Sequence, residues 1–260
     1  DEKYAVLNAD DPSFEHFRKL SAVEVITYGI NNEADVSAKN ITMTSQGIRF
    51  LLITFKGEIE IHLQLVGGFN VYNALAGITA ALIEGIPLEN IRSSLSLLTS
   101  ISGRMEIVDE GQDYLVLVDY AHTPDALENV LKSIKEFTKG KVITVFGCGG
   151  DRDKGKRPIM GEIASRYSNN VFVTSDNPRS EDPIKIMNDI EKGMKKSNSL
   201  QYELLADREE AIYKAIKEAT SNDVVIIAGK GHETYQKFKD KTIHFDDKEI
   251  ARKAISEKQY

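Results

Sequence analysis

The sequence predicts an α/β protein whose second half folds around a mostly parallel, doubly wound, Rossmann-like sheet. Short apolar runs rich in β-branched residues alternate there with amphipathic segments. The apolar runs predict strands at residues 114–118, 142–146, 171–174, 202–205, 224–228 and 242–245. The segments between them predict helices at residues 124–138, 158–167, 183–194, 207–219 and 247–257. Regular alternation of this kind is typical of βαβ units, which add strand after strand to one parallel sheet.

The first hundred residues predict a smaller α/β region. A helix at 13–20 separates strands at 4–7 and 23–28. Alternating apolar residues then predict short strands at 35–44, 47–55 and 58–65, with Lys56-Gly57 as a hairpin turn. Together these predict an antiparallel meander attached to the edge of a parallel sheet. Two helices follow, one opening near Asn70 and running through Glu84, the other at 88–98. The small polar residues 99–103 predict a domain boundary after residue 102.

Composition excludes several classes of protein. The chain has 260 residues, of which 41% are hydrophobic and 28% charged, with a net charge of −7. This acidic balance argues against a nucleic-acid partner. The single cysteine, Cys148, excludes an intramolecular disulfide and fits the reducing cytoplasm, where we expect the protein. No apolar run is long enough to span a bilayer, so we expect no membrane partner.

Four strands of the second half end in polar or glycine-rich sequences. These are DYAH at 119–122, GCGGDR at 147–152, DNPR at 176–179 and GKGHE at 229–233. Any one of them could be a loop that caps a helix. Because the carboxyl ends of parallel strands meet at one edge of the sheet, where ligands bind, together they favour a site. Arg152 and Arg179 at this edge indicate a ligand with a carboxylate or phosphate.

The charged residues around these strand ends refine the ligand class. Lys154, Lys156 and Arg157 lie just before a predicted helix, where a bound anion would offset their unfavourable interaction with the helix dipole. A solvated run of charges is the alternative interpretation. Glu233 is a candidate partner for an ammonium group, and with two arginines nearby it indicates an amino acid.

Three further features leave functional and structural interpretations open. Asn70 and Asn73 share a helix face, but a helix cap followed by an exposed Asn explains them as well. His122 and His232 could be ligands or acid–base groups, although capping histidines are commoner. No cysteine–histidine spacing of a metal site occurs, so we expect no metal ligands in this chain.

Several of these motifs resemble those of a known protein family. The segments GCGGDRDKGKRP, DNPRSEDP, AGKGHE and VDYAHTPDAL resemble the C-terminal domain of the Mur ligases. The segments NADDP, GGFNVYNALAG and SGRMEIVDE resemble the end of the central ATPase domain of that family. The resemblance extends over the whole chain in order, and the DNPR form resembles the members that add meso-diaminopimelate rather than lysine.

The resemblance implies an ATP-dependent amide-forming ligase of peptidoglycan synthesis. In this family ATP and Mg²⁺ activate the carboxylate of UDP-N-acetylmuramoyl-L-alanyl-D-glutamate as an acyl phosphate, which the amine of the incoming amino acid attacks. The implied diaminopimelate site comprises Arg152, Asp176, Asn177, Pro178, Arg179, Gly229 and Glu233. The implied ATP contacts, on the adenine and ribose side, are Asn70, Asn73, Arg104 and Asp119, with His122 and Lys156 as weaker candidates. The catalytic base is not identified.

The sequence also departs from the family pattern. No glycine-rich loop ending in Gly-Lys-Ser or Gly-Lys-Thr occurs, and GCGGDRDKGK lacks that ending. The domain for the uridine nucleotide and the lysine of the magnesium site have no counterpart either. We therefore expect a C-terminal portion of a longer ligase, with a partial central domain at residues 1–102 and a Rossmann-like domain from 103. Alone, it should bind diaminopimelate weakly or not at all and should not turn over ATP.

Two alternatives remain at this stage. The first is another ligase of the same superfamily, such as a different Mur ligase or a folylpolyglutamate synthetase. The second is an amino-acid-binding module without catalytic activity.

Overall fold

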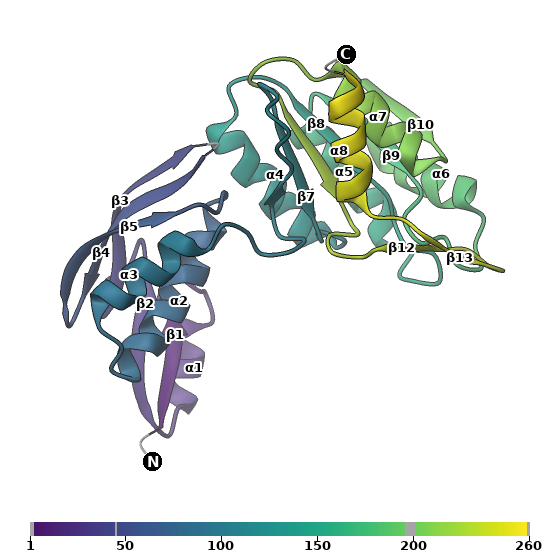
Figure 1. Ribbon diagram of the computed structural model, residues 1–260. Coiled ribbons are helices and arrows are strands. Elements are labelled where there is room, and N and C mark those ends of the chain that lie inside the picture. The colour runs from purple at the N-terminus through teal and green to yellow at the C-terminus, as the bar shows by residue number, and fades with distance from the viewer. Residues whose placement is uncertain (1–2, 45, 196–200, 259–260) are drawn as a thin grey trace. The chain divides into compact units, whose positions relative to one another are not determined.

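The computed structural model describes residues 3–44, 46–195 and 201–258. The chain forms two compact units, Asp1–Thr99 and Ser100–Tyr260 (Figure 1).

The first unit contains a five-stranded sheet in the order β1-β2-β3-β4-β5. Its strands are β1 (Tyr4–Asn8), β2 (Glu24–Gly29), β3 (Val36–Thr44), β4 (Gly47–Thr54) and β5 (Gly57–Leu63). The first two pairings are parallel, and the last two are antiparallel. The predicted meander at the edge of a parallel sheet is therefore confirmed.

Three helices accompany this sheet: α1 (Phe14–Leu20), α2 (Phe69–Ile83) and α3 (Leu88–Leu97). The buried face of α2 carries Val71, Leu75, Ile78 and Leu82, which recur at the spacing of one helix face. These side chains share a core with the inward residues of β3, β4 and β5.

The second unit contains a six-stranded sheet in the order β10-β9-β8-β11-β7-β6. The strands are β6 (Glu106–Ile107), β7 (Leu115–Asp119), β8 (Val142–Phe146), β9 (Asn170–Thr174), β10 (Gln201–Leu205) and β11 (Val224–Ala228). All pairings are parallel except that of β6 with β7. The predicted Rossmann-like sheet is confirmed, with β6 as a short antiparallel addition that its two residues did not reveal.

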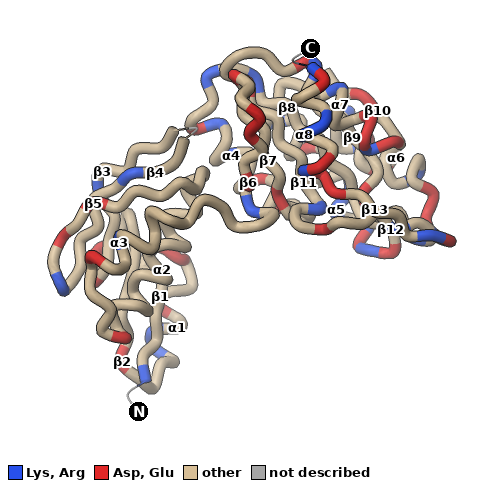
Figure 2. Tube along the Cα trace, viewed as in Figure 1, with Lys and Arg blue, Asp and Glu red and all other residues tan. Residues whose placement is uncertain are grey.

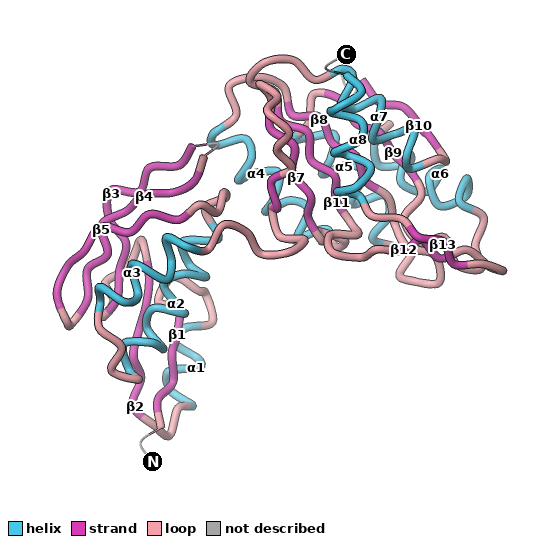
Figure 3. Tube along the Cα trace, in the orientation of Figure 1, coloured by secondary structure: helices cyan, strands magenta, loops and turns pink. Residues whose placement is uncertain are grey.

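Helices cover both faces of this sheet (Figure 3). They are α4 (Pro124–Phe137), α5 (Lys156–Tyr167), α6 (Pro183–Met194), α7 (Arg208–Glu218) and α8 (Asp247–Lys258). α5 packs between α4 and α6, whereas α7 packs against α8. Alternate strand residues such as Val116, Val118 and Ile143 join the core under α7 and α8. Because helices cover both faces of the sheet, successive residues of each central strand are buried on one side or the other. This is why the strands appear in the sequence as continuous apolar runs.

The prediction of residues 242–245 as a strand of the parallel sheet is wrong. β13 (Thr242–His244) pairs instead with β12 (Tyr235–Lys237) as a separate antiparallel ribbon. All three residues of β13 are exposed, so this run lacks the burial of a central strand. Helix α5 also begins at Lys156, two residues before the predicted start at Pro158.

A candidate amino-acid site at the strand ends

The strand-end loops of the second unit leave the sheet at one edge. Ala228, the last residue of β11, pairs with Asp119 of β7 on one side and with Phe146 of β8 on the other. The chain winds from β8 toward β9 through α5, and reaches β11 from the far edge through α7. β8 and β11 therefore flank the point where the strand order reverses, which is where open α/β sheets bind ligands.

The loops after β8 and β9 form one bonded structure. The Gly150 amide donates to Asn177 O (2.9 Å), and the Asp151 amide donates to Glu181 Oε1 (2.7 Å). A Cβ on Gly150 would lie 1.9 Å from Pro178 O, so only glycine permits this approach. The contact brings the GCGGDR and DNPR sequences together, as the convergence of strand ends predicted.

Arg152 and Arg179 lie on the same side of this structure. Arg179 Nη1 is 2.7 Å and Arg152 Cγ is 3.7 Å from the position that a Cβ on Gly149 would take. Arg179 Nη1 also donates to Gly150 O (2.8 Å), which fixes its guanidinium against the loop. Arg152 is exposed. The Arg179 guanidinium and the aliphatic part of the Arg152 side chain thus both lie beside Gly149, and Arg152 Nη1 donates to Asp151 O (3.0 Å).

The Asn177 and Glu233 side chains are hydrogen-bonded to each other. Asn177 Nδ2 donates to Glu233 Oε2 (2.8 Å), although the two residues are far apart in sequence. The Lys230 ammonium also lies 3.1 Å from Glu233 Oε2 and contacts Asn177 Oδ1 at 3.3 Å. Glu233, which we predicted as the partner of a ligand ammonium, therefore already carries an ammonium partner from the protein.

Asp176 and Gly229 face each other across the sheet edge. The Asp176 carboxylate accepts from the Asn177 amide (2.6 Å), and its Oδ2 would lie 2.9 Å from a Cβ on Gly229. Gly229 has a φ of 116°, a conformation that only glycine adopts readily. Asp176 is buried, and any side chain at residue 229 would press against its carboxylate.

The β12–β13 ribbon holds the DNPR loop from outside. The Arg179 amide donates to Lys237 O (3.0 Å), and the Lys237 amide donates to Asn177 Oδ1 (2.9 Å). Gln236 Nε2 donates to Asp176 O (2.9 Å). β12 was not predicted from the sequence, because its three residues carry no strand pattern of their own.

A buried ion pair, Arg208 with Asp247, lies at the end of β11. Arg208 and Asp247 are both fully buried, and Arg208 Nη2 also donates to Ala228 O (3.1 Å). Ala228 directly precedes Gly229, so this arginine anchors the end of β11. Their pairing was not predicted, because Arg208 begins α7 and Asp247 begins α8, and nothing in the sequence links the starts of these two helices.

The anion predicted beside Lys154, Lys156 and Arg157 is supplied partly by the protein itself. Arg157 is buried, and its guanidinium contacts both Glu181 oxygens (2.9 and 3.1 Å) and Asp189 (3.1 Å). Lys154 lies 3.3 Å from the same Glu181 carboxylate. The hydrogen bonds from Arg157 and from the Asp151 amide lower the pKa of Glu181 to about 2. Two of the three cations are therefore neutralised internally.

The predicted ATP-side residues of this unit form a second cluster around an aromatic ring. The Arg104 guanidinium lies over the Tyr120 ring at 5.3 Å, and the His122 and His232 rings lie 4.5 and 5.2 Å from it. Lys156 Nζ donates to His122 O (2.6 Å). Arg104 and His122 are exposed, so both can reach a ligand.

Asp119 is placed differently from an exposed ligand contact. Its carboxylate is buried and accepts from the Met105 amide (2.8 Å) and the Ala121 amide (2.7 Å). Burial raises the pKa of this carboxyl, while the two backbone hydrogen bonds oppose the rise. Asp119 thus joins the segment that carries Arg104 to the end of β7.

In the first unit, Asn70 and Asn73 are hydrogen-bonded to each other (Asn73 Nδ2 to Asn70 Oδ1, 3.1 Å). Asn70 is buried and donates to Val66 O (2.8 Å). The residue that caps α2 is Gly68, so the alternative of Asn70 as a helix cap is wrong. Asn73 is exposed, and its amide oxygen is directed away from this bond.

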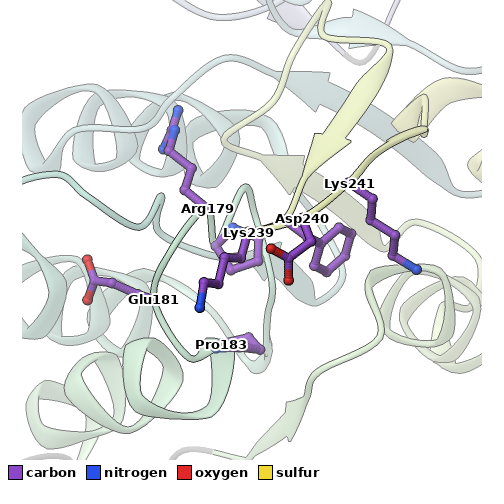
Figure 4. Close-up of a pocket in the computed structure, with 8 residues that line it drawn as sticks. Arg179, Glu181, Pro183, Lys239, Asp240 and Lys241 are labelled. Atoms are coloured by element: carbon purple, nitrogen blue, oxygen red, sulfur yellow. The ribbon is translucent and has the colours of Figure 1, made fainter.

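A pocket of about 350 Å³ lies beside the DNPR loop (Figure 4). Its charged side chains, including Arg179, Glu181 and Lys239, point in different directions and do not converge. The hairpin tip next to it carries Lys239, Asp240 and Lys241, and therefore both signs of charge (Figure 2).

Within residues 3–44, 46–195 and 201–258, no helix is long and apolar enough to cross a membrane. The same residues contain no group of three or more His, Cys, Asp or Glu side chains arranged to hold a metal ion.

Comparisons with known proteins agree with both units. The Mur ligase middle domain family matches residues 1–81, and the family described as Mur ligase, glutamate ligase domain, matches residues 103–231. A UDP-N-acetylmuramoyl-L-alanyl-D-glutamate--2,6-diaminopimelate ligase from Halalkalibacterium halodurans is 51% identical over 256 residues, or 98% of this chain and 52% of the relative. The ligase of the same name from Bacillus cereus is 51% identical over 255 residues, or 98% and 51%.

Solved structures match as well. A structure of a ligase with that same name has a TM-score of 0.71 at 38% identity and covers 99% of this chain and 54% of that chain. A MurF ligase from Thermotoga maritima in complex with ADP shares the fold, with a TM-score of 0.67 at 16% identity over 99% of this chain and 53% of that chain.

The fold defines an α/β protein with a Rossmann-like second unit, and the relatives that match it bear the names of ligases. The chain belongs to the Mur ligase family. It spans about half the length of the curated relatives it matches.

Proposed function

We propose that this chain carries the amino-acid-binding part of a ligase that joins meso-diaminopimelate to UDP-N-acetylmuramoyl-L-alanyl-D-glutamate in cytoplasmic peptidoglycan synthesis. The observation that carries the proposal is the cluster at one sheet edge around Asn177, which is hydrogen-bonded to both the Asp176 and the Glu233 carboxylates and whose carbonyl lies 3.4 Å from Arg179 Nη1. An amino acid needs both charges, and diaminopimelate has a second amino acid head that lysine lacks. The relatives that are 51% identical bear the name of this activity.

In the proposed reaction, a phosphoryl group from ATP activates the substrate carboxylate, and the amine of diaminopimelate displaces phosphate to form the amide. The residues of this chain bind and orient the amine. Arg179 and Arg152 hold carboxylate groups, Asp176 and Glu233 meet ammonium groups, and Asn177, Pro178 and Gly229 shape the site.

Residues predicted to contact ATP occur in each unit, and each set is considered by itself. Asn73 is exposed and presents an amide group suited to a base, while the buried Asn70 is hydrogen-bonded to it. Arg104 presents an exposed guanidinium suited to phosphates. Arg104 is supported by Asp119, while His122 and Lys156 lie alongside. For Mg²⁺ the described residues offer no ligand set, so no step is assigned to a metal here. We further propose that residues 1–102 are a partial ATP-binding domain and that the remaining parts of the ligase supply the phosphate and metal sites.

The test is calorimetric titration of this chain with meso-diaminopimelate, with L-lysine as the control ligand. We expect at most weak heat from diaminopimelate and none from lysine, with loss of that heat in Arg179→Ala but not in Arg252→Ala, which removes an exposed arginine of α8. Binding of lysine or glutamate instead would contradict the proposal. A folylpolyglutamate synthase from Mycobacterium tuberculosis shares the fold at 16% identity, so glutamate tests that alternative.

A second assay addresses the reaction itself. We expect no ATP-dependent ligation by the chain alone, because its sequence has no Gly-Lys-Ser/Thr phosphate loop. Measurable ligation by the purified chain would overturn this expectation.

A further inference from the structure

Lys230 is a buried cation that the reaction scheme does not use. Its side chain is fully buried, between the end of β11 and the start of β12. Its Nζ contacts three oxygens: Glu233 Oε2 (3.1 Å), Asn177 Oδ1 (3.3 Å) and the carbonyl of Tyr235. The Tyr235 ring lies 5.3 Å from the same nitrogen. Three accepting oxygens match the three protons of an ammonium, so Lys230 is charged and fully engaged.

This engagement determines how Asn177 is oriented. Asn177 Oδ1 accepts from Lys230 and from the Lys237 amide (2.9 Å). Because both neighbours are donors, the oxygen of the amide must face them. The Asn177 Nδ2 group is consequently directed to Glu233 Oε2 (2.8 Å). Without the ammonium, one of the two constraints on the amide orientation is lost.

Lys230 also selects which oxygen of Glu233 is used internally. Oε2 receives both Lys230 and Asn177, so internal partners converge on one oxygen. The Glu233 side chain retains 17% of its exposed area, whereas Lys230 retains none. A ligand can therefore reach the carboxylate but not the ammonium that holds it.

We propose that Lys230 is a positioning residue of the amino-acid site, which orients Asn177 and Glu233 so that Glu233 presents its outer oxygen to an ammonium group of the ligand. The inference rests on the proposed function for the identity of the ligand. The contacts among Lys230, Asn177 and Glu233 are present without a ligand, so that part of the inference is independent of the proposed function.

The test uses Lys230→Met, which keeps the length of the side chain and removes its charge. Lys185→Met makes the same change at an exposed lysine of α6 and serves as the control. We expect Lys230→Met to raise the dissociation constant for meso-diaminopimelate by about 10- to 100-fold, the usual effect of losing a hydrogen bond to a charged group. Lys185→Met should leave it unchanged.

A double-mutant cycle separates positioning from general loss of structure. If Lys230 acts through Glu233, Lys230→Met should weaken binding by less than about threefold in a Glu233→Gln background. Effects of the two substitutions that simply multiply would overturn the proposal.

A measurement without ligand distinguishes failure of this inference from failure of the proposed function. In the NMR spectrum of the unliganded chain, the Asn177 side-chain amide protons should exchange slowly with solvent. In Lys230→Met they should exchange at least tenfold faster while the backbone amides of β8 keep their protection. Absence of diaminopimelate binding with this change present would reject the ligand and retain the positioning role. Unchanged Asn177 exchange would reject the positioning role whatever the ligand.

Discussion

Arg208 and Asp247 form a two-point ion pair inside the second unit, with Nε 2.7 Å from Oδ1 and Nη2 2.7 Å from Oδ2. Neither side chain is exposed to solvent. Removing one partner of such a pair leaves a buried charge without compensation. We expect Asp247→Asn to lower the free energy of unfolding by about 3–5 kcal/mol, measured by urea denaturation.

The control for this prediction lies on the same helix. Glu249→Gln breaks the exposed pair with His244 and should change the free energy of unfolding far less than Asp247→Asn does. If Asp247→Asn were as mild as Glu249→Gln, the buried pair would not support the end of β11 as we describe.

The Glu181 carboxylate should make stability depend on pH in the acid range. Its pKa falls from 4.5 to about 2, chiefly through the hydrogen bonds from Arg157. A lowered pKa in the folded state stabilises the fold above the ordinary pKa, and this stabilisation is lost as the pH falls toward 2. The stability difference between the wild type and Glu181→Gln should therefore be largest at neutral pH and shrink below about pH 5. Urea midpoints at pH 7, 5, 4 and 3 measure it, and a constant difference would contradict the assignment.

Gly229 should be required for binding rather than for folding alone. A Cβ there would lie 2.9 Å from the Asp176 carboxylate, at a φ of 116°. We expect Gly229→Ala to weaken diaminopimelate binding at least tenfold and to cost about 1–3 kcal/mol of stability. Gly111→Ala is a matched control, because Gly111 also has a positive φ (87°) but no atom within 4 Å of its Cβ position. It should lose stability without losing binding.

In the first unit, Asp10 should hold the loop that follows β2. Its carboxylate accepts from the amides of Ile30 (2.6 Å) and Asn32 (2.7 Å) and from the Tyr72 hydroxyl (2.9 Å). Burial, together with the bond to Asp10, raises the pKa of Tyr72 to about 12. Asp10→Asn should move this pKa back toward 10, and spectrophotometric titration of the tyrosines, with Tyr72→Phe to identify the signal, measures it. An unmoved pKa would assign the shift to burial alone.

Much of the fold was predictable from sequence because burial leaves a local pattern. The runs at Val142–Phe146 and Val224–Ala228 are fully buried, and their apolar composition marks them as central strands. β6 and β12 escaped prediction because two or three residues show no period. The run at Thr242–His244 was wrongly predicted as a strand of the parallel sheet, because β-branched residues are also common in an exposed ribbon.

The candidate site was predictable only as a set of strand ends. Convergence follows from topology, so the proximity of Gly150 to Asn177 could be expected. The partner of each charge could not, because pairing depends on three-dimensional neighbours. Arg157 reads as one more cation before a helix, yet Glu181 and Asp189 on a different segment neutralise it. Lys230 stood in a recognised motif, and nothing local indicated that Glu233 was its partner.

The attachment of the DNPR loop to the β12–β13 ribbon has a consequence for how substrate preference evolves. Gln236 and Lys237 hold the loop through its backbone and through Asn177, although the ribbon itself is largely exposed. Exposed hairpins tolerate substitutions and changes of length better than a sheet edge does. Under the proposed function, selection for a different amino acid has an indirect route: changes in the hairpin can shift the DNPR loop while every residue proposed to contact the ligand is retained. Specificity variants raised in the laboratory should carry mutations at residues 235–244 as well as within the loop itself.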